Sequence, residues 1–192
     1  MRAFVAALPP PEAVEHLDAF LSSRREAAAL SGRHYRWTDP SQWHLTLAFS
    51  SEVPDRALDD LEARLERAAR KRRPVELSFA GGGAFPHPDR AKVLWSGLLA
   101  SEDDRVELDR MATGARAALG KAGAQVDGQR FRAHLTLARL GHPDNVTSFV
   151  RVLDAYQGPT WTLDEVALVA SYLGEGPRRR PRHEVIGTYP LA

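Results

Sequence analysis

The stretches QWHLTLAFS (residues 42–50) and RAHLTLARL (residues 132–140) share the five letters HLTLA, which place His44 and His134 at equivalent positions. A repeated word of five letters can arise by chance, so we judge the repeat by what its residues would do together. Both stretches are short, apolar and β-prone, which predicts two similar strands, one in each half of the chain.

Alternation along a strand divides each motif into an apolar face and a polar face. The apolar rows are expected to hold Trp43, Leu45, Leu47 and Phe49 in the first motif and Phe131, Ala133, Leu135 and Leu137 in the second. The polar rows are expected to hold Gln42, His44, Thr46 and Ala48 in the first motif and Arg130, Arg132, His134, Thr136 and Ala138 in the second. Each strand would therefore present one histidine and one threonine opposite the core.

Two histidines that face each other across a cleft can serve as an acid and a base, because imidazole titrates near neutrality. Displacement at phosphorus fits this arrangement. One histidine activates the nucleophile, the other protonates the leaving oxygen, and the hydroxyls of Thr46 and Thr136 hold the remaining oxygens. This scheme needs no metal ion and no cofactor. Taken singly, each histidine is explained more simply as a solvated residue of a sheet face, and only the pairing favours a catalytic site.

Composition limits the class of protein. A chain of 192 residues with 43% hydrophobic residues predicts one domain over residues 1–192. The absence of cysteine excludes disulfides, thiolate metal sites and a cysteine nucleophile, and it suits a reducing cytoplasm. No stretch approaches the roughly 20 apolar residues of a membrane span, so we expect a soluble protein. The net charge of +1 means that any anion binding must come from a local cluster.

The remaining sequence predicts strands and helices in mixed order. Strands are expected over residues 2–8, 74–81, 91–99, 160–171 and 182–191, and helices over residues 9–30, 53–73, 101–123 and 144–158. Ser101 and Asp104 have the spacing of a capping box at the start of the third helix. The Gly- and Pro-rich residues 81–90 predict a loop. This order favours an α+β fold.

The paired motifs HLTLAF and HLTLAR resemble the two His-x-Thr motifs of the two-histidine phosphoesterase superfamily. Five stretches are similar to its bacterial RNA 2′,3′-cyclic phosphodiesterase branch: MRAFVAALPPP (1–11), YRWTDPSQWHLTLAF (35–49), GAFPHPDRAKVLW (83–95), FRAHLTLARL (131–140) and VALVASYLGEGPRRRPRHEVIGTYPL (166–191). The resemblance implies a bilobal, pseudo-duplicated α+β fold, in which two antiparallel sheets flank a central cleft, helices lie on the outside and each sheet contributes one motif.

The resemblance also implies an activity. The family opens an RNA-terminal 2′,3′-cyclic phosphate to a 2′-phosphate, and some members join RNA ends reversibly through a 2′,5′ bond. By this resemblance His44 is the proton donor and His134 the proton acceptor, with Thr46 and Thr136 beside them. The expected partner is RNA with a cyclic end, or a related cyclic or 2′,5′-linked nucleotide, and the expected form is a monomer without cofactor, metal or membrane contact. Arg139 matches the arginine that follows the family's second motif, and it would contact phosphate or form a structural ion pair.

Three positions depart from the family's pattern. Ala133 stands where a proline usually precedes the second histidine, and His183 replaces an expected aromatic residue. The first motif runs into Ser50 rather than a glycine. These departures leave the reacting groups in place and affect loop geometry and substrate preference.

Basic residues near the second motif raise two further expectations. By strict alternation Arg139 would share the face of Leu135, where an unpaired cation is costly, so the strand should end or bulge there. Arg132 and Arg139 would lower the pKa of His134 and keep it neutral, as a base must be, whereas His44 lacks such neighbours.

The run PRRRPRH (177–183), which contains Arg178–Arg182, would guide an RNA backbone or remain a solvated loop, and the solvated loop is the simpler reading. The large aromatic residues near the motifs are expected to pack in the core or its rim rather than to stack on bases. These are Tyr35, Trp37, Phe85 and Trp95.

Two alternatives stay open at this stage. The paired histidines would bind a metal ion if carboxylates accompanied them, but none stands at ligand spacing near either motif. A non-catalytic protein that binds RNA ends or nucleotides would use the same cleft residues as an enzyme.

Overall fold

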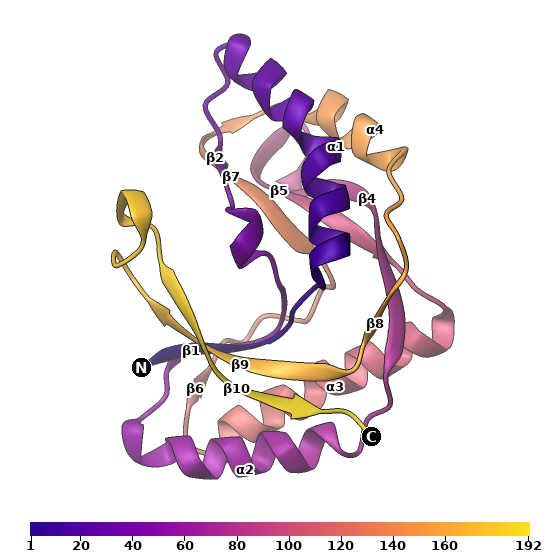
Figure 1. Cartoon of the computed structure of the whole chain (residues 1–192). Coiled ribbons are helices and arrows are strands. Elements are labelled where there is room, and N and C mark those ends of the chain that lie inside the picture. Colours follow the sequence, from indigo (N-terminus) through magenta and orange to yellow (C-terminus); the bar gives the residue numbers. More distant parts are fainter.

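The computed structural model describes residues 1–192 as two five-stranded antiparallel sheets with helices on their outer faces (Figure 1). The strands are β1 (Arg2–Ala7), β2 (Arg36–Trp37), β3 (Leu45–Glu52), β4 (Val75–His87), β5 (Arg90–Leu99), β6 (Gln125–Val126), β7 (Leu135–Asp144), β8 (Trp161–Leu163), β9 (Glu165–Tyr172) and β10 (Arg182–Pro190). The helices are α1 (Pro11–Leu30), α2 (Leu58–Ala69), α3 (Glu102–Lys121) and α4 (Thr147–Asp154), with 3₁₀ turns at Pro40–Gln42, Asp55–Ala57 and Pro177–Arg179.

The two motif strands occupy equivalent positions. The first sheet has the order β10-β9-β1-β3-β6, and the second has the order β8-β4-β5-β7-β2. Motif strand β3 therefore lies between β1 and the two-residue edge strand β6, and motif strand β7 lies between β5 and the two-residue edge strand β2. All neighbouring pairs are antiparallel.

The two halves of the chain exchange parts with each other. Helix α1 follows β1 of the first sheet but contacts β4 of the second, while α3 follows β5 of the second sheet but packs on β3 of the first. The edge strands cross in the same way, since β2 precedes the first motif yet pairs with β7, and β6 precedes the second motif yet pairs with β3. Through these exchanges, each sheet is packed or paired with elements from both halves of the chain.

Local signals explain where the long helices begin. Pro10 and Pro11 start α1, where a missing N–H costs nothing. Ser101 caps α3, its side chain accepting a hydrogen bond from the backbone N–H of Asp104, so the predicted capping interaction is confirmed.

None of the four helices has both the length and the apolar character needed to cross a membrane.

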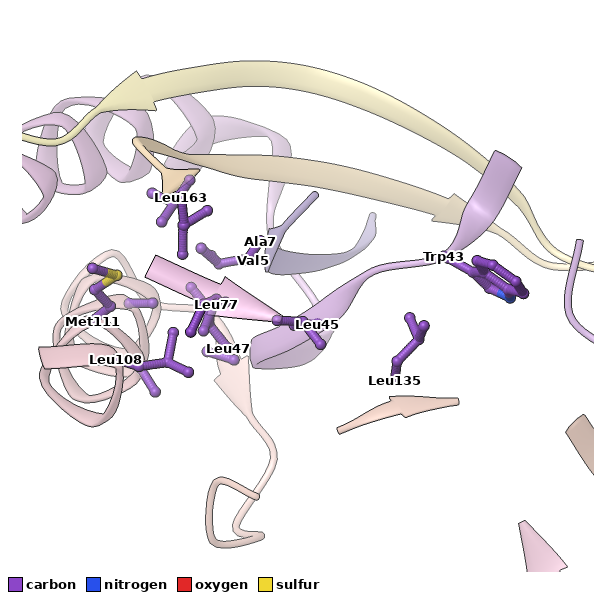
Figure 2. Close-up of a cluster of buried hydrophobic side chains, with 14 of the residues drawn as sticks. Val5, Ala7, Trp43, Leu45, Leu47, Leu77, Leu108, Met111, Leu135 and Leu163 are labelled. Carbon is purple, nitrogen blue, oxygen red and sulfur yellow. The ribbon is translucent and has the colours of Figure 1, made fainter. Parts of the chain in front are cut away.

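A single large core joins the sheets. A continuous cluster of 39 buried hydrophobic residues includes Leu45 of β3 and Leu135 of β7, at 0% and 1% exposure. Figure 2 shows part of this cluster, with Leu77 of β4 and Met111 of α3 beside the motif residues. The apolar faces of the two motif strands therefore contribute to the same core.

The structure corrects two predicted elements. Residues 81–90 do not form a long loop, because β4 continues through Gly81–Gly83 to His87 and pairs with β5, leaving only Pro88 and Asp89 as a turn. The strand predicted over residues 160–171 is divided at Asp164. Its first part, β8, joins the second sheet, and its second part, β9, joins the first. The fold class predicted from the sequence is confirmed.

Candidate active site

The two motif histidines are held in the same way. Each lies directly before the first residue of its strand, β3 or β7. Nδ1 of His44 donates to the carbonyl oxygen of Gln42 at 2.8 Å, and Nδ1 of His134 donates to the carbonyl oxygen of Arg132 at 2.6 Å. Because a carbonyl oxygen only accepts, each Nδ1 carries a hydrogen and each Nε2 is left to exchange protons.

Each motif strand contains a bulge immediately after its threonine. Thr46 and Ala48 lie opposite consecutive residues of β1, which leaves Leu47 without a partner. Thr136 and Ala138 likewise lie opposite consecutive residues of β5, which leaves Leu137 without a partner. An extra residue reverses the alternation of the side chains that follow it.

The bulges correct the predicted faces of three residues and confirm the expectation for a fourth. Ala48 and Ala138 lie in the core instead of the polar row. Phe49 lies on the cleft face instead of the core face, where it pairs with Phe4 across the strands and packs against the small cluster that contains Phe4. Arg139 also reaches the cleft, as the expected bulge predicts.

All five predicted site residues line one cleft of about 850 Å³ between the two sheets. They are His44, Thr46, His134, Thr136 and Arg139. The cleft volume lies within the range of small-ligand and cofactor sites. The pairing of the motifs, inferred from sequence, is therefore present in space.

The cleft concentrates positive charge. Six arginines line it: Arg2, Arg36, Arg139, Arg178, Arg179 and Arg180. None of the six forms an ion pair, and Asp39 is the only acidic residue in the lining. Arg36 and Arg139 lie directly opposite each other on β2 and β7, an arrangement of like charges that costs free energy unless an anion sits between them. The local cluster needed for anion binding is thus present in a protein of net charge +1.

The loop between β9 and β10 crosses to the opposite wall of the cleft. Arg180 donates to the carbonyl oxygen of Trp37 at 2.5 Å, and Gln42 Nε2 donates to the carbonyl oxygen of Pro181 at 3.2 Å. Arg178 and Arg179 have φ values of 55° and 59°, a region that non-glycine residues rarely occupy. Residues 178–181 and His183 of the run PRRRPRH therefore line the cleft, while Arg178 and Arg179 remain exposed to solvent, as the simpler expectation of a solvated loop requires.

Aromatic rings surround both histidines. The ring of Phe4 stacks on His44 with centroids 4.5 Å apart, and His183 meets His44 edge-on at 5.6 Å. Phe85 and Trp95 lie around His134 with centroids at 5.0 and 6.1 Å. These rings limit the rotation of each imidazole. Phe85 and Trp95 therefore pack against the second motif histidine at the edge of the cleft.

Phe4, Arg36 and His183 also line the cleft, although the sequence does not predict them as site residues. Phe4 lies in a strand that is apolar on both faces, so alternation does not distinguish it. Arg36 reaches the cleft only because β2 pairs with a strand about 100 residues away. His183 stood out in the sequence as a departure from the family's pattern, which was the one available signal.

The environment lowers the pKa of both histidines. Burial is the main cause at His44, where the pKa falls to about 4, and nearby His183, Arg139 and His134 lower it further. Burial also lowers the pKa of His134, with added repulsion from Arg139 and Arg132. The expectation that His44 lacks positive neighbours is wrong, because Arg139 acts on both histidines across the cleft.

Comparison with known proteins identifies similar sequences. A family model described as the 2′-5′ RNA ligase superfamily matches residues 5–175. A protein of Archaeoglobus fulgidus named RNA 2′,3′-cyclic phosphodiesterase is 34% identical over 116 residues, which cover 60% of this chain and 61% of that protein. A protein of the same name from Aeropyrum pernix is 31% identical over 133 residues, which cover 69% of this chain and 73% of that protein.

Solved structures show the same fold. The protein TT0787 of Thermus thermophilus is 27% identical, with a TM-score of 0.77 over 100% of this chain and 98% of that chain. LigT of E. coli, solved in complex with 3′-AMP, is 21% identical, with a TM-score of 0.76 over 100% of this chain and 98% of that chain. At 21% identity this likeness concerns the fold alone.

Proposed function

Because the chain belongs to the 2′-5′ RNA ligase superfamily, we propose that it opens a terminal 2′,3′-cyclic phosphate of RNA to a 2′-phosphate. The family predicted from the sequence is confirmed, and the curated relatives are named for an enzyme of this kind. One observation carries the proposal furthest. Two histidines with identical backbone anchors line a cleft that also holds six arginines without ion-pair partners.

The proposed reaction uses the two Nε2 atoms on opposite sides of the phosphorus. Neutral His134 takes a proton from water as the water attacks phosphorus. Protonated His44 gives a proton to the 3′-oxygen as the P–O3′ bond breaks, and the 2′-phosphate remains. A bound phosphate anion would raise the pKa of both imidazoles. His44, whose pKa is lowered by burial in the free protein, would therefore be protonated when the substrate is bound.

Neighbouring side chains would hold the phosphate during this step. The Thr46 and Thr136 hydroxyls, which line the cleft, would donate to the non-bridging oxygens, and the Arg139 guanidinium would donate charge-assisted hydrogen bonds to the same group. Arg36, directly opposite Arg139, completes a pair of cations around one anion. These roles need no divalent ion or other cofactor.

RNA is the proposed substrate, since the positive wall extends beyond the reacting group. The arginines of residues 178–180 line the cleft on the side of residues 34–39, where upstream phosphates of a strand would lie. Tyr35 and Trp37 line the same part of the cleft and offer rings for stacking. A related nucleotide with a cyclic phosphate or a 2′,5′ bond would fit the same groups.

We also propose that the protein acts as a monomer in the cytoplasm. One chain supplies every residue of the cleft, so no second copy is needed to complete the site. The absence of cysteine suits a reducing compartment.

Leaving-group replacement tests the proposed function and the direction of proton transfer. His44→Ala and His134→Ala should each lower kcat by roughly 10²- to 10⁴-fold on a short RNA with a cyclic end, assayed in EDTA. If sulfur replaces the bridging 3′-oxygen, the leaving thiolate needs no proton. The sulfur substrate should therefore restore kcat in His44→Ala and leave kcat low in His134→Ala.

His142→Ala is the matched control, because His142 is exposed and lies outside the cleft. Product identification should find a 2′-phosphate. Wild-type binding without turnover would show a binding protein instead of an enzyme. Equal rescue of both variants, or a 3′-phosphate product, would contradict the assigned direction.

A further inference from the structure

A row of three polar side chains crosses the first sheet beside His44. Arg2 of β1 lies opposite Ser171 of β9, and Ser171 lies opposite His183 of β10. These three strands are adjacent in the sheet, as Figure 1 shows. Residues that oppose each other on neighbouring strands project from the same face of a sheet. All three line the cleft, and we call them the β1-β9-β10 row.

The row offers hydrogen-bond donors that no protein group uses. Ser171 is only 7% exposed, yet its hydroxyl has no partner in the protein, and neither ring nitrogen of His183 has one. The guanidinium of Arg2 lies over the ring of Phe49, 4.6 Å from its centroid, and forms no ion pair. Buried polar groups normally have partners. A hydroxyl, an imidazole and a guanidinium without acceptors on one face are suited to an anion.

His183 connects this row to the reacting centre. Its ring meets His44 edge-on with centroids 5.6 Å apart, and it meets Phe4 edge-on at 5.1 Å. An imidazole keeps at least one N–H in either protonation state. A phenyl ring at this position would pack in the same way but would donate no hydrogen bond. The histidine that departs from the family's pattern therefore adds a donor beside the proposed acid.

The covalent structure of ribose places the next phosphate of the substrate on this wall. In the proposed reaction His44 protonates the 3′-oxygen, so the 3′-carbon of the terminal ribose faces the wall that carries His44. The 4′- and 5′-carbons continue from the 3′-carbon and not from the 2′-carbon. A phosphate on the 5′-oxygen therefore lies farther along the same wall, which the row also lines. This reasoning rests on the proposed function and on its assignment of His44.

We propose that the β1-β9-β10 row is a phosphate subsite, which binds the phosphate on the 5′-oxygen of the nucleoside that carries the cyclic phosphate. Ser171 and His183 donate hydrogen bonds to its oxygens, and Arg2 supplies positive charge. The loop of residues 173–181 continues from β9 and β10, so its arginines lie next along the path of an RNA strand. The subsite favours substrates with a phosphate at this position over nucleoside cyclic phosphates whose 5′-oxygen is free.

Two pairs of substrates that differ in this phosphate test the subsite. The first pair is uridine 2′,3′-cyclic phosphate with and without a 5′-phosphate. The second is a dinucleotide with a cyclic end, whose linkage is either a phosphodiester or a neutral methylphosphonate. In wild type, kcat/KM should be higher by roughly tenfold or more for the charged member, because hydrogen bonds to charged groups are strong. The gain should lie mainly in KM, since the phosphate is bound before and during the reaction.

Two variants remove donors from the row. Ser171→Ala removes the hydroxyl, and His183→Phe removes the ring N–H but keeps a ring against Phe4 and His44. Each should lower the ratio of kcat/KM between charged and uncharged members by roughly fivefold or more. A purely structural role would not move this ratio, because both members of a pair react at the same centre.

Arg182→Gln is the matched control. Arg182 precedes His183 on β10 but is exposed, forms ion pairs with Glu175 and Glu184, and lies outside the cleft. It should leave the ratio within about twofold of wild type.

A gain for the charged member of either pair supports the subsite and identifies whether it takes a terminal 5′-phosphate, an RNA linkage or both. Equal kcat/KM within both pairs, variants that keep the wild-type ratio, or an equal fall in the control would overturn it. If wild type turns over none of the four substrates, the proposed function itself fails.

Discussion

At the scale of single residues, one backbone carbonyl decides which nitrogen of each histidine is chemically available. The carbonyls of Gln42 and Arg132 bind Nδ1, so Nε2 of both His44 and His134 remains for proton exchange. The anchor comes from two residues earlier in each motif. The repeat therefore preserves the orientation of the ring as well as its identity.

The threonines should matter less than the histidines. Thr46→Val and Thr136→Val each remove a neutral hydrogen-bond donor worth about 0.5–1.5 kcal/mol, so kcat/KM for cyclic-phosphate RNA should fall by roughly two- to tenfold. Thr188→Val provides a control on an exposed position of β10 outside the cleft. A loss as large as that of His134→Ala would show that a threonine takes part in proton transfer.

The lowered pKa values predict an acidic pH profile for the free enzyme. The proposed reaction needs one protonated and one neutral histidine, and the pKa values of His44 and His134 both lie below 6.5 in the free protein. The profile of kcat/KM should therefore be a bell whose two limbs fall below pH 6.5. The profile of kcat should lie at higher pH, because bound phosphate stabilises the imidazolium form.

Arg139→Met checks the sign of this effect. Loss of a positive charge favours protonation of nearby imidazoles, so both limbs of kcat/KM should move to higher pH. Arg151→Met, outside the cleft, should leave the profile unchanged. Limbs at or above pH 6.5 in the wild type, or a downward shift in Arg139→Met, would contradict the role given to burial and to Arg139.

At the scale of elements, matching bulges create an asymmetric site from a symmetric motif. Each bulge turns the side chain five residues after the histidine into the cleft, and these side chains are Phe49 and Arg139. One wall thus presents an aromatic ring where the other presents a cation. The difference places positive charge on the wall that carries His134.

The loop between β9 and β10 should contribute to RNA binding through its arginines. Arg178→Gly with Arg179→Gly removes two charges and suits the positive φ values, so the melting temperature should not fall. KM for RNA should rise, and the slope of log KM against log salt should decrease by about 1.4 if each arginine contacts one phosphate of a single strand. A cyclic mononucleotide should show a smaller change.

The control for the loop is Arg56→Ala with Arg151→Ala, which removes the same charge from exposed positions outside the cleft. An equal change in the salt slope for both double variants would show that net charge, rather than the loop, governs RNA binding.

At the scale of the whole molecule, exchanged helices and a common core should make the two lobes unfold together. Leu45→Ala and Leu135→Ala, one in each motif strand, should each destabilise the protein by about 2–5 kcal/mol and lower one shared transition. The transition is followed by circular dichroism and by tryptophan fluorescence. Leu30→Ala is the control, since Leu30 is 90% exposed, and its effect should stay within about 0.5 kcal/mol.

Two separate transitions, of which Leu135→Ala shifts only one, would show that the lobes are independent folding units. That outcome would contradict the prediction of a single domain over residues 1–192.

The sequence by itself determined the features that depend on local periodicity and local bonding. The HLTLA repeat identified His44, His134 and their threonines, and the capping pattern at Ser101 located the start of α3. Alternation also showed that Arg139 required a bulge. Each of these inferences uses residues within a few positions of one another, where side-chain direction follows from the backbone alone.

Only the tertiary structure decided which distant segments meet. Gly81–Gly83 reads as a turn until pairing with β5 extends the strand, and Arg36 has no role until β2 pairs with β7. The arginines of residues 178–180 reach the cleft because the loop binds the carbonyl oxygen of Trp37. A second cavity, lined by residues of β3 and α3, likewise forms only because α3 packs on the sheet of the other half of the chain. Such contacts depend on strand register and on exchanged elements, which no local pattern encodes.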